Sequence, residues 1–115
     1  MELNANIWKF ELAGFVEEFQ YSEYGPEGHY TWHIDLGKGP SSTRRLSFSV
    51  QLSDPDEYEG GELELHCGGE RPIAAPRTFG TAIVFPSFLL HRVAPVRQGL
   101  RRSLVGWASG LCPLR

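Results

Sequence analysis

The sequence is poor in cysteine, in net positive charge and in long apolar runs. It holds two cysteines, Cys67 and Cys112, among 115 residues, and its first residues lack the basic start and continuous apolar stretch of a secretion signal. A disulfide scaffold is therefore not expected, and we expect a cytoplasmic protein whose cysteines are small apolar fillers. No apolar run approaches the ~20 residues that cross a bilayer, so no membrane span is expected either.

Positive charge is too scarce for a general nucleic-acid binder. Eleven Lys and Arg stand against fourteen Asp and Glu, a formal net charge of -3, whereas such binders cluster basic residues against phosphates. The charges are unevenly spread, because basic residues gather from Arg92 to the C-terminus and acidic ones from Asp54 to Glu64. This asymmetry either steers an anionic small molecule or reflects two solvated surfaces, and the sequence leaves both readings open.

The composition that remains, 41% hydrophobic and 22% charged, is typical of one globular domain, which we expect to span residues 1–115. Short runs of alternating or continuous apolar residues, separated by Gly- and Pro-rich turns, favour a β-sandwich or barrel over alternating helices and strands. The expected strands are 8–12, 15–24, 29–36, 45–52, 62–67, 81–85, 89–93 and 101–107, with a short extended piece around Ile73.

Three details of this pattern matter for the site. Residues 15–19 fit a helical turn as well as a strand, and residues 37–43, 54–61 and 95–99 are expected loops. The strand over 45–52 has an apolar face and a polar face, one of which fills the core while the other could face a pocket. The run over 81–85 is continuously apolar, which predicts a strand buried on both sides.

A candidate metal site lies in the stretch Y-G-P-E-G-H-Y-T-W-H-I-D, from Tyr24 to Asp35. In a strand, side chains two residues apart share a face, so His33 and Asp35 would project side by side. A third ligand must come from elsewhere, and the best candidate is His91 in F-P-S-F-L-L-H-R-V. Two histidines and one carboxylate on one side of a metal leave the other side open, as in non-haem Fe(II) oxygenases.

Each of these residues also has a simpler explanation. His33 and Asp35 could form a surface hydrogen-bonded pair, and His91 could be a core histidine among apolar neighbours. His29 and His66 are further available ligands, but neither has the partner spacing, so surface or supporting roles are favoured for both.

The last expected strand brings a charge and a hydroxyl to one face. Alternation groups Arg101 with Ser103 and Trp107, and places Arg102 on the opposite face. A guanidinium beside a hydroxyl suits the distal carboxyl group of a dicarboxylate, because Arg binds carboxylates in a bidentate way. If Arg102 faced the site instead, Ser103 could not. Trp107, like Trp32, either lines a substrate pocket or belongs to the core.

These segments resemble the Fe(II)- and 2-oxoglutarate-dependent oxygenases, specifically the prolyl 4-hydroxylase-like branch that includes bacterial PKHD-type hydroxylases. The resemblance runs from about Trp8 to Arg115. Its most specific parts are Y-x-x-x-G-x-Y-x-W-H-x-D, R-R-L-S-F-S-V-Q-L-S-D-P-D-E-Y-E-G-G-E-L, F-P-S-F-L-L-H-R-V-A-P-V and G-L-R-R-S-L-V-G-W. It implies an all-β double-stranded β-helix, the jelly-roll form that includes cupins, here with little or no N-terminal helical support.

The resemblance also implies a site. His33, Asp35 and His91 would hold Fe(II). Arg101, helped by Ser103, would pair with the 5-carboxylate of 2-oxoglutarate, and the Tyr24 hydroxyl would face this co-substrate. Such an enzyme consumes O2 and 2-oxoglutarate, releases succinate and CO2, and hydroxylates an aliphatic C–H, with ascorbate as a supporting reductant. The implied substrate is a prolyl or other amino-acid side chain, free or in a peptide.

Two other functions fit the sequence: a cupin-like metalloprotein that does not use 2-oxoglutarate, and a non-catalytic binding domain that keeps the fold. The related hydroxylases carry N-terminal helices that brace the sheet, and almost none of that fits before Trp8. We therefore expect an exposed sheet and self-association into a homo-oligomer. The loops carry no substrate signature, and Tyr58 in the acidic loop either gates the substrate or packs on a neighbour.

Overall fold

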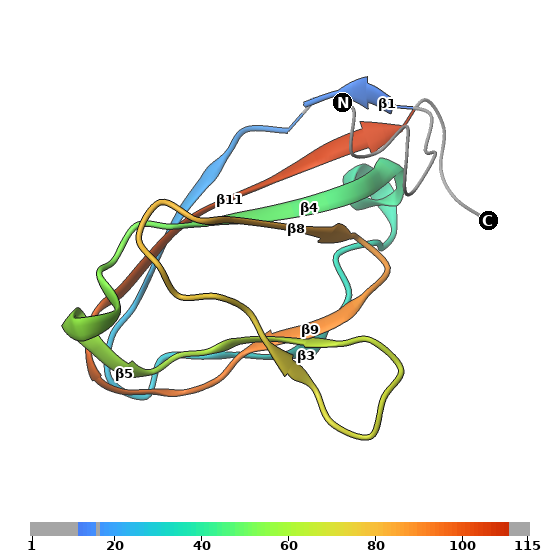
Figure 1. Cartoon of the computed structure of the whole chain (residues 1–115). Helices are drawn as coiled ribbons and strands as arrows, with labels where there is room; N and C mark the ends of the chain where they lie inside the picture. The colour runs from blue at the N-terminus through green and yellow to red at the C-terminus, as the bar shows by residue number, and fades with distance from the viewer. Residues whose placement is uncertain (1–11, 16, 111–115) are drawn as a thin grey trace.

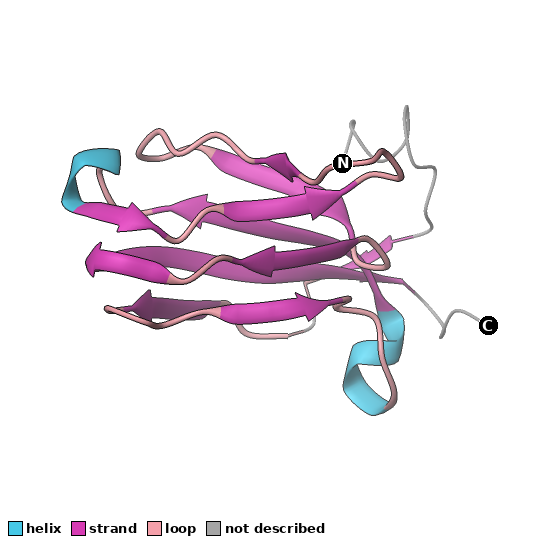
Figure 2. Cartoon of the chain, turned by 90° about the horizontal axis from the view of Figure 1, so that it is seen from below, coloured by secondary structure: helices cyan, strands magenta, loops and turns pink. Residues whose placement is uncertain are grey.

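The computed structural model describes residues 12–15 and 17–110. The strands are β1 (Leu12–Gly14), β2 (Gln20–Tyr24), β3 (Tyr30–His33), β4 (Arg44–Gln51), β5 (Tyr58–Gly60), β6 (Leu63–His66), β7 (Ile73–Ala74), β8 (Ala82–Pro86), β9 (Leu90–Val93), β10 (Val96–Gly99) and β11 (Arg101–Gly110). The 3-10 helices η2 (Gly39–Thr43) and η3 (Pro55–Glu57) lie at opposite ends of the molecule (Figure 2). No helix within the described ranges combines the length and the apolar character that a membrane crossing requires.

The strands form two facing layers (Figure 1). One layer is a five-stranded sheet with the order β1-β11-β4-β8, in which β2 also pairs with β11. The other contains the sheet β3-β9-β6-β7 and, in line with it, the pair β10-β5. Every pairing is antiparallel. The expected all-β sandwich is therefore confirmed.

The two faces of β4 have opposite roles. Its polar residues Ser47, Ser49 and Gln51 are buried, at 1%, 6% and 3% exposure, and point into the space between the layers. On the outer face, the Phe48 ring packs edge-on against the rings of Phe15 and Phe19. The alternation in the sequence predicts both faces, and the structure shows that the polar one faces inward.

The apolar interior lies toward one side of the sandwich. A cluster of buried residues joins β6, β8 and β9, and it consists of Leu63, Ala75, Ile83, Phe85 and Val93. The polar side chains of β4 and β11 face the same interior, and β4 lies directly beside β8 in its sheet. The interior therefore has an apolar part at β6, β8 and β9 and a polar part at β4 and β11, and both parts line one pocket.

Several segments differ from the expectation. The strand expected over 29–36 ends at His33, and part of the loop over 37–43 forms η2, which has Pro in its first turn. The acidic loop contains η3, where Asp54 and Glu57 form a capping box, followed by β5. The loop over 95–99 is largely the strand β10, because β5 offers it an edge to pair with.

Two expectations about burial are wrong. Strand β8 is the edge strand of its sheet and is buried on one face only: Ile83 and Phe85 are buried, whereas Ala82 is exposed. Cys67 is an exposed free thiol in the loop after β6 and not a small apolar filler. Cys112, most of the strand expected over 8–12 and the start of the resemblance at Trp8 lie outside the described residues.

Candidate active site

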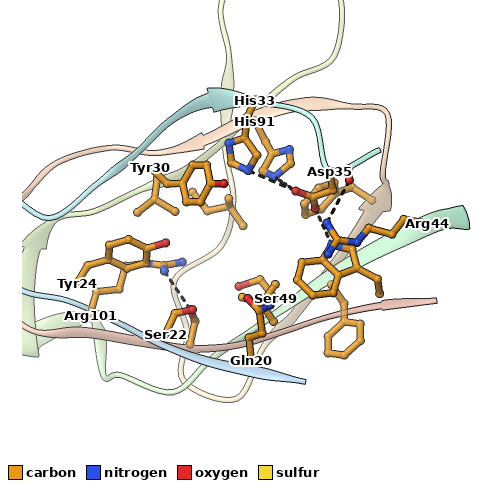
Figure 3. Close-up of a pocket in the computed structure, with 17 residues that line it drawn as sticks. Gln20, Ser22, Tyr24, Tyr30, His33, Asp35, Arg44, Ser49, His91 and Arg101 are labelled. Carbon is orange, nitrogen blue, oxygen red and sulfur yellow. Dashed lines mark hydrogen bonds and ion pairs between the residues drawn. The ribbon is translucent and has the colours of Figure 1, made fainter. Parts of the chain in front are cut away.

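Three candidate metal ligands meet at one end of the pocket. His33 ends β3 and pairs with His91 on the neighbouring strand β9, so their rings lie 4.2 Å apart. Asp35 Oδ1 lies 3.3 Å from His33 Nε2 and 3.2 Å from His91 Nε2 (Figure 3). One nitrogen or oxygen from each residue lies within 4.8 Å of the others. The structure thus brings together the three residues that the sequence singles out as ligands.

Asp35 reaches this position in a different way from the one expected. It lies two residues beyond the end of β3, so strand alternation alone does not place it. Instead its backbone N–H donates to the carbonyl of Ser87 at 2.9 Å, in the turn between β8 and β9. The turn that leads to His91 therefore also holds Asp35.

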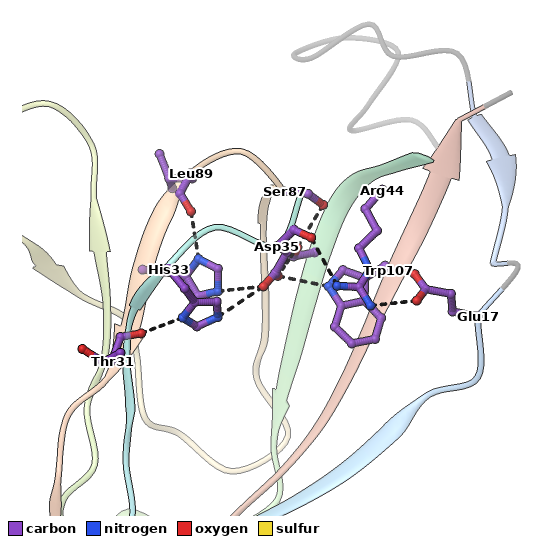
Figure 4. A network of polar contacts seen from close by, with 10 residues as sticks. Glu17, Thr31, His33, Asp35, Arg44, Ser87, Leu89 and Trp107 are labelled. Carbon is purple, nitrogen blue, oxygen red and sulfur yellow. Dashed lines mark hydrogen bonds and ion pairs between the residues drawn. The ribbon is translucent and has the colours of Figure 1, made fainter. Parts of the chain in front are cut away.

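The two imidazoles are oriented by backbone carbonyls. His33 Nδ1 lies 2.7 Å from the Thr31 carbonyl and His91 Nδ1 lies 2.8 Å from the Leu89 carbonyl (Figure 4). A carbonyl only accepts hydrogen bonds, so each Nδ1 carries a proton, and each Nε2 is the nitrogen that faces Asp35 and can bind either a proton or a metal ion. Two Nε2 atoms and one carboxylate oxygen that face one another are the donor set of a divalent metal site.

The charge states at neutral pH suit a metal. Burial would raise the pKa of Asp35, but its contacts with His91 and the hydrogen bond from Ser47 outweigh burial and lower that pKa to about 2. The pKa of His33 is lowered, chiefly because burial disfavours the imidazolium. A charged carboxylate and a neutral imidazole are the forms in which these groups bind metals.

Arg101 forms the other end of the pocket. Its side chain is 1% exposed, and its two terminal nitrogens donate to Ser103 Oγ and Gln51 Oε1, both at 3.3 Å. Its Nε has no hydrogen-bond partner, and within the described ranges no carboxylate forms an ion pair with it. Burial lowers the pKa of Arg101, yet a guanidinium remains charged at neutral pH. A buried cation with only neutral partners is a binding site for an anion.

The pocket between these ends measures about 230 Å³. It takes its apolar lining from Leu63, Phe85 and Val93, and the Tyr24 ring lies 5.9 Å from the Arg101 guanidinium. In Figure 3 the pocket runs from Arg101 and Tyr24 on the left to Asp35 and Arg44 on the right. Since ligand pockets for drug-sized molecules span roughly 300 to 1,000 Å³, this volume suits a small co-substrate.

The structure separates the competing residues. Ser103 and Trp107 line the pocket with Arg101, whereas Arg102 points outward and contacts Glu57 Oε2 at 3.3 Å. His29 is exposed and His66 lies beside Trp32, away from the three ligands. Trp32 itself lies under the Arg92 guanidinium and does not line the pocket. Tyr58 is buried, and Arg77 covers its ring at 4.4 Å, so it packs on a neighbour and does not gate the pocket.

The sequence pattern did not predict several contacts of the site. Ser47 Oγ and Trp107 Nε1 donate to Asp35 Oδ2 at 2.5 Å and 3.0 Å. The half-exposed ring of Tyr30 stacks on His33, with centroids 3.9 Å apart, at the mouth of the pocket. The polar face of β4 was a usable signal for Ser47, because three polar residues alternate there in an otherwise apolar strand. Tyr30 gave no such signal.

Comparison with known proteins places these features in a family. The family model described as "2OG-Fe(II) oxygenase superfamily" matches residues 19–109. A PKHD-type hydroxylase of Synechococcus sp. (strain CC9605) is 38% identical over 101 residues, which cover 88% of this chain and 46% of the relative. Another, of Synechococcus elongatus, is 40% identical over 106 residues, covering 85% of this chain and 47% of the relative. The chain spans about half the length of these curated relatives.

Solved structures share the fold. A Pseudomonas putida prolyl-4-hydroxylase superposes with a TM-score of 0.73 at 24% identity, over 95% of this chain and 59% of that one. A Trichoplax adhaerens prolyl hydroxylase, solved with a hypoxia inducible factor peptide, gives 0.75 at 18% identity, over 93% of this chain and 49% of that one. The expected double-stranded β-helix is therefore confirmed.

The lowered pKa of Asp35 predicts how the metal-free protein responds to acid. Its folded pKa of about 2 lies below the ordinary 3.8, so its stabilisation is fully present above about pH 5 and is lost as the pH falls through about 2. The difference corresponds to about 2 kcal/mol. Chemical unfolding of Asp35→Asn at several pH values should show a weaker acid destabilisation than wild type. Asp56→Asn, at an exposed position, is the control, and parallel curves for wild type and Asp35→Asn would contradict the prediction.

Proposed function

Because this chain belongs to the 2OG-Fe(II) oxygenase superfamily, we propose that it is an Fe(II)- and 2-oxoglutarate-dependent dioxygenase that hydroxylates an aliphatic C–H of a prolyl or other amino-acid side chain. One observation carries the proposal: a two-histidine, one-carboxylate cluster lies at one end of a small pocket, and at the other end lies a buried guanidinium whose hydrogen-bond partners among the described residues are neutral. Bound Fe(II) would supply the oxidative chemistry, with O2 and 2-oxoglutarate consumed and succinate and CO2 released.

The residues at the metal end would hold the iron by three atoms: Nε2 of His33, Nε2 of His91 and Oδ1 of Asp35. Their Nδ1 hydrogen bonds keep both imidazoles facing the metal. The negative charge of Asp35 offsets part of the charge of the divalent ion in a setting that excludes most water. Three protein ligands leave room for a co-substrate and for O2.

The residues at the other end would bind the distal carboxylate of 2-oxoglutarate. The buried guanidinium of Arg101 supplies a fixed positive charge, and Ser103 Oγ beside it is a hydroxyl donor. The Tyr24 ring closes this part of the pocket. The apolar side chains of Leu63, Phe85 and Val93 would keep the co-substrate dry between its two anchors.

The substrate would approach at the mouth of the pocket, where Tyr30 is half exposed and stacks on His33. The pocket itself is too small for both a co-substrate and a peptide, so a side chain would enter from outside. A peptide or amino-acid substrate is supported by the relatives' names, prolyl hydroxylase and PKHD-type hydroxylase. The exposed free thiol of Cys67 and the need for ferrous iron both favour a reducing, cytoplasmic location, with ascorbate as a supporting reductant.

The alternatives account for less of the structure. A cupin-like metalloprotein without 2-oxoglutarate would explain the ligand cluster but not a buried Arg101 that forms no ion pair with any carboxylate of residues 12–15 or 17–110. A non-catalytic binding domain would need neither. Both features are explained together when the pocket holds a metal and a dicarboxylate.

The proposal predicts succinate formation that depends on both Fe(II) and 2-oxoglutarate. His91→Ala should abolish it while circular dichroism still shows a folded β protein, because the site loses a ligand and the sheet loses no backbone hydrogen bond. His66→Ala, on the neighbouring strand β6, should retain wild-type turnover. A mass-spectrometric screen of peptides and amino acids for a gain of one oxygen would then identify the substrate. Full activity of His91→Ala would remove that residue from the ligand set.

Arg101→Ala should raise the 2-oxoglutarate concentration needed for half-maximal succinate release by about tenfold to a hundredfold. The reason is that a buried charge-assisted pair contributes roughly 1.5 to 3 kcal/mol. Arg102→Ala, which removes the adjacent outward-facing guanidinium, is the matched control and should leave this concentration unchanged. The opposite result for the two variants would show that Arg102 binds the co-substrate.

A homo-oligomer is also part of the proposal. The aromatic side chains of Phe15, Phe19 and Tyr21 lie at the outer face of the five-stranded sheet and are 52%, 50% and 54% exposed. An exposed aromatic face of this kind favours association with a second copy. Size-exclusion chromatography should therefore give a mass above 12.9 kDa at micromolar concentration, and a strictly monomeric profile would contradict it.

A further inference from the structure

The two oxygens of the Asp35 carboxylate have different surroundings. Oδ1 faces both imidazoles, whereas Oδ2 accepts hydrogen bonds from Ser47 Oγ on β4 and Trp107 Nε1 on β11 (Figure 4). These donors come from the sheet opposite to the two histidines. Because each lone pair of Oδ2 has a donor, Oδ1 is left to face the metal position.

The Trp107 indole packs against an ion pair formed by Arg44 and Glu17. The Arg44 guanidinium lies 3.7 Å from the centre of the Trp107 ring, and its Nη1 donates to the Asp35 backbone carbonyl at 3.2 Å. Its Nε and Nη2 donate to the two oxygens of Glu17, both at 2.7 Å. Arg44 therefore acts on Asp35 in two ways: it donates directly to the Asp35 carbonyl, and it packs on the Trp107 ring whose N–H donates to the Asp35 carboxylate.

The stack of Arg44 on Trp107 orients a hydrogen-bond donor toward Asp35. The indole N–H is the single polar group of Trp107, and in a 5% exposed side chain it is directed at the oxygen of Asp35 that does not face the histidines. A bidentate Arg–carboxylate pair is rigid in direction, so Glu17 fixes the plane of the guanidinium over the ring. Glu17 lies in the segment before β2, 27 residues from Arg44 in sequence.

We propose that Trp107 and Ser47 are positioning residues that make Asp35 bind the metal through one oxygen, and that the Glu17–Arg44 pair locks Trp107 in this role. The inference rests on the proposed metal site and adds to it the residues that orient its carboxylate ligand. It also assigns a role to Glu17 in the segment before β2, beside the packing of Phe15 and Phe19 on Phe48. Hydrogen bonds to a ligand's free atom typically change metal affinity by about 10- to 100-fold.

The chain provides a matched control on its other sheet. Trp32 lies 5.0 Å below the Arg92 guanidinium, and Arg92 pairs with Glu64 at 2.7 and 2.8 Å. This second Trp–Arg–Glu stack has the same chemistry as the first, but the side-chain donors to Asp35 Oδ2 are Ser47 and Trp107 and not Trp32. Substitutions in it report the cost of disrupting such a stack without affecting the ligand.

The test is titration of the metal-free protein with Co(II), followed by calorimetry and by the visible absorption of the bound ion. Trp107→Phe keeps the ring packing and removes the N–H, so it should weaken Co(II) binding about tenfold or more and alter the absorption spectrum. Glu17→Gln, at a partly exposed position, should weaken binding by less and in the same direction. Trp32→Phe and Glu64→Gln should match wild type in both readouts.

The outcomes distinguish the inference from the function on which it rests. Wild-type Co(II) affinity and spectrum in both Trp107→Phe and Glu17→Gln would overturn the positioning role and leave the metal site standing. Equal weakening in the control pair would also overturn it, since the effect would then be one of general stability. If the wild-type protein bound no Co(II), the proposed metal site itself would fail. Thermal unfolding of each variant verifies folding, and Glu17→Gln tests the inference even if Trp107→Phe does not fold.

Discussion

The carboxylate of Asp35 interacts with side chains of both layers of the sandwich at the site. One of its oxygens takes hydrogen bonds from the five-stranded sheet, and the other faces two imidazoles of the opposite sheet. A charged carboxylate is stable in such a place only when polar groups surround it, and the contacts with His91, followed by the hydrogen bonds from Ser47 and Trp107, lower its pKa to about 2 in spite of burial. Asp35 therefore connects Ser47 and Trp107 of one sheet with the two histidines of the other.

A second constraint is the division of the interior. The walls contributed by β6, β8 and β9 are apolar, whereas β4 and β11 present serines, a glutamine and an arginine to the same space. A sandwich gains most of its stability from apolar burial between its sheets, so polar side chains at these positions reduce that gain. Their presence is explained by the pocket, since hydroxyl and amide groups satisfy the Asp35 and Arg101 charges that an apolar wall could not.

The pocket also separates two tasks along its length. The metal ligands come from β3, from Asp35 two residues beyond it and from β9, while the anion site comes from the beginning of β11 with support from β4. The strands β3, β9 and β11 carry His33, His91 and Arg101, so the sheets fix the distance between these three residues. The mouth, by contrast, is formed where Tyr30 is exposed, so the substrate meets the less enclosed part of the site.

The sequence by itself predicted the strand pattern of 45–52 and 101–107 and the shared face of Arg101 and Ser103, because side-chain alternation is a local property. Residue chemistry also singled out His33, Asp35 and His91 as candidate ligands, but the turn at Ser87, and not alternation, places Asp35 beside the histidines. Tertiary structure alone decided where β3 stops, that β8 is an edge strand, that β10 pairs with β5, and that Cys67 is exposed. It also decided which donors reach Asp35, since Ser47 and Trp107 are 12 and 72 residues away from it in sequence. Periodicity tells which face a side chain occupies but not what stands opposite that face, and the opposing partner exists only once the two sheets have packed together.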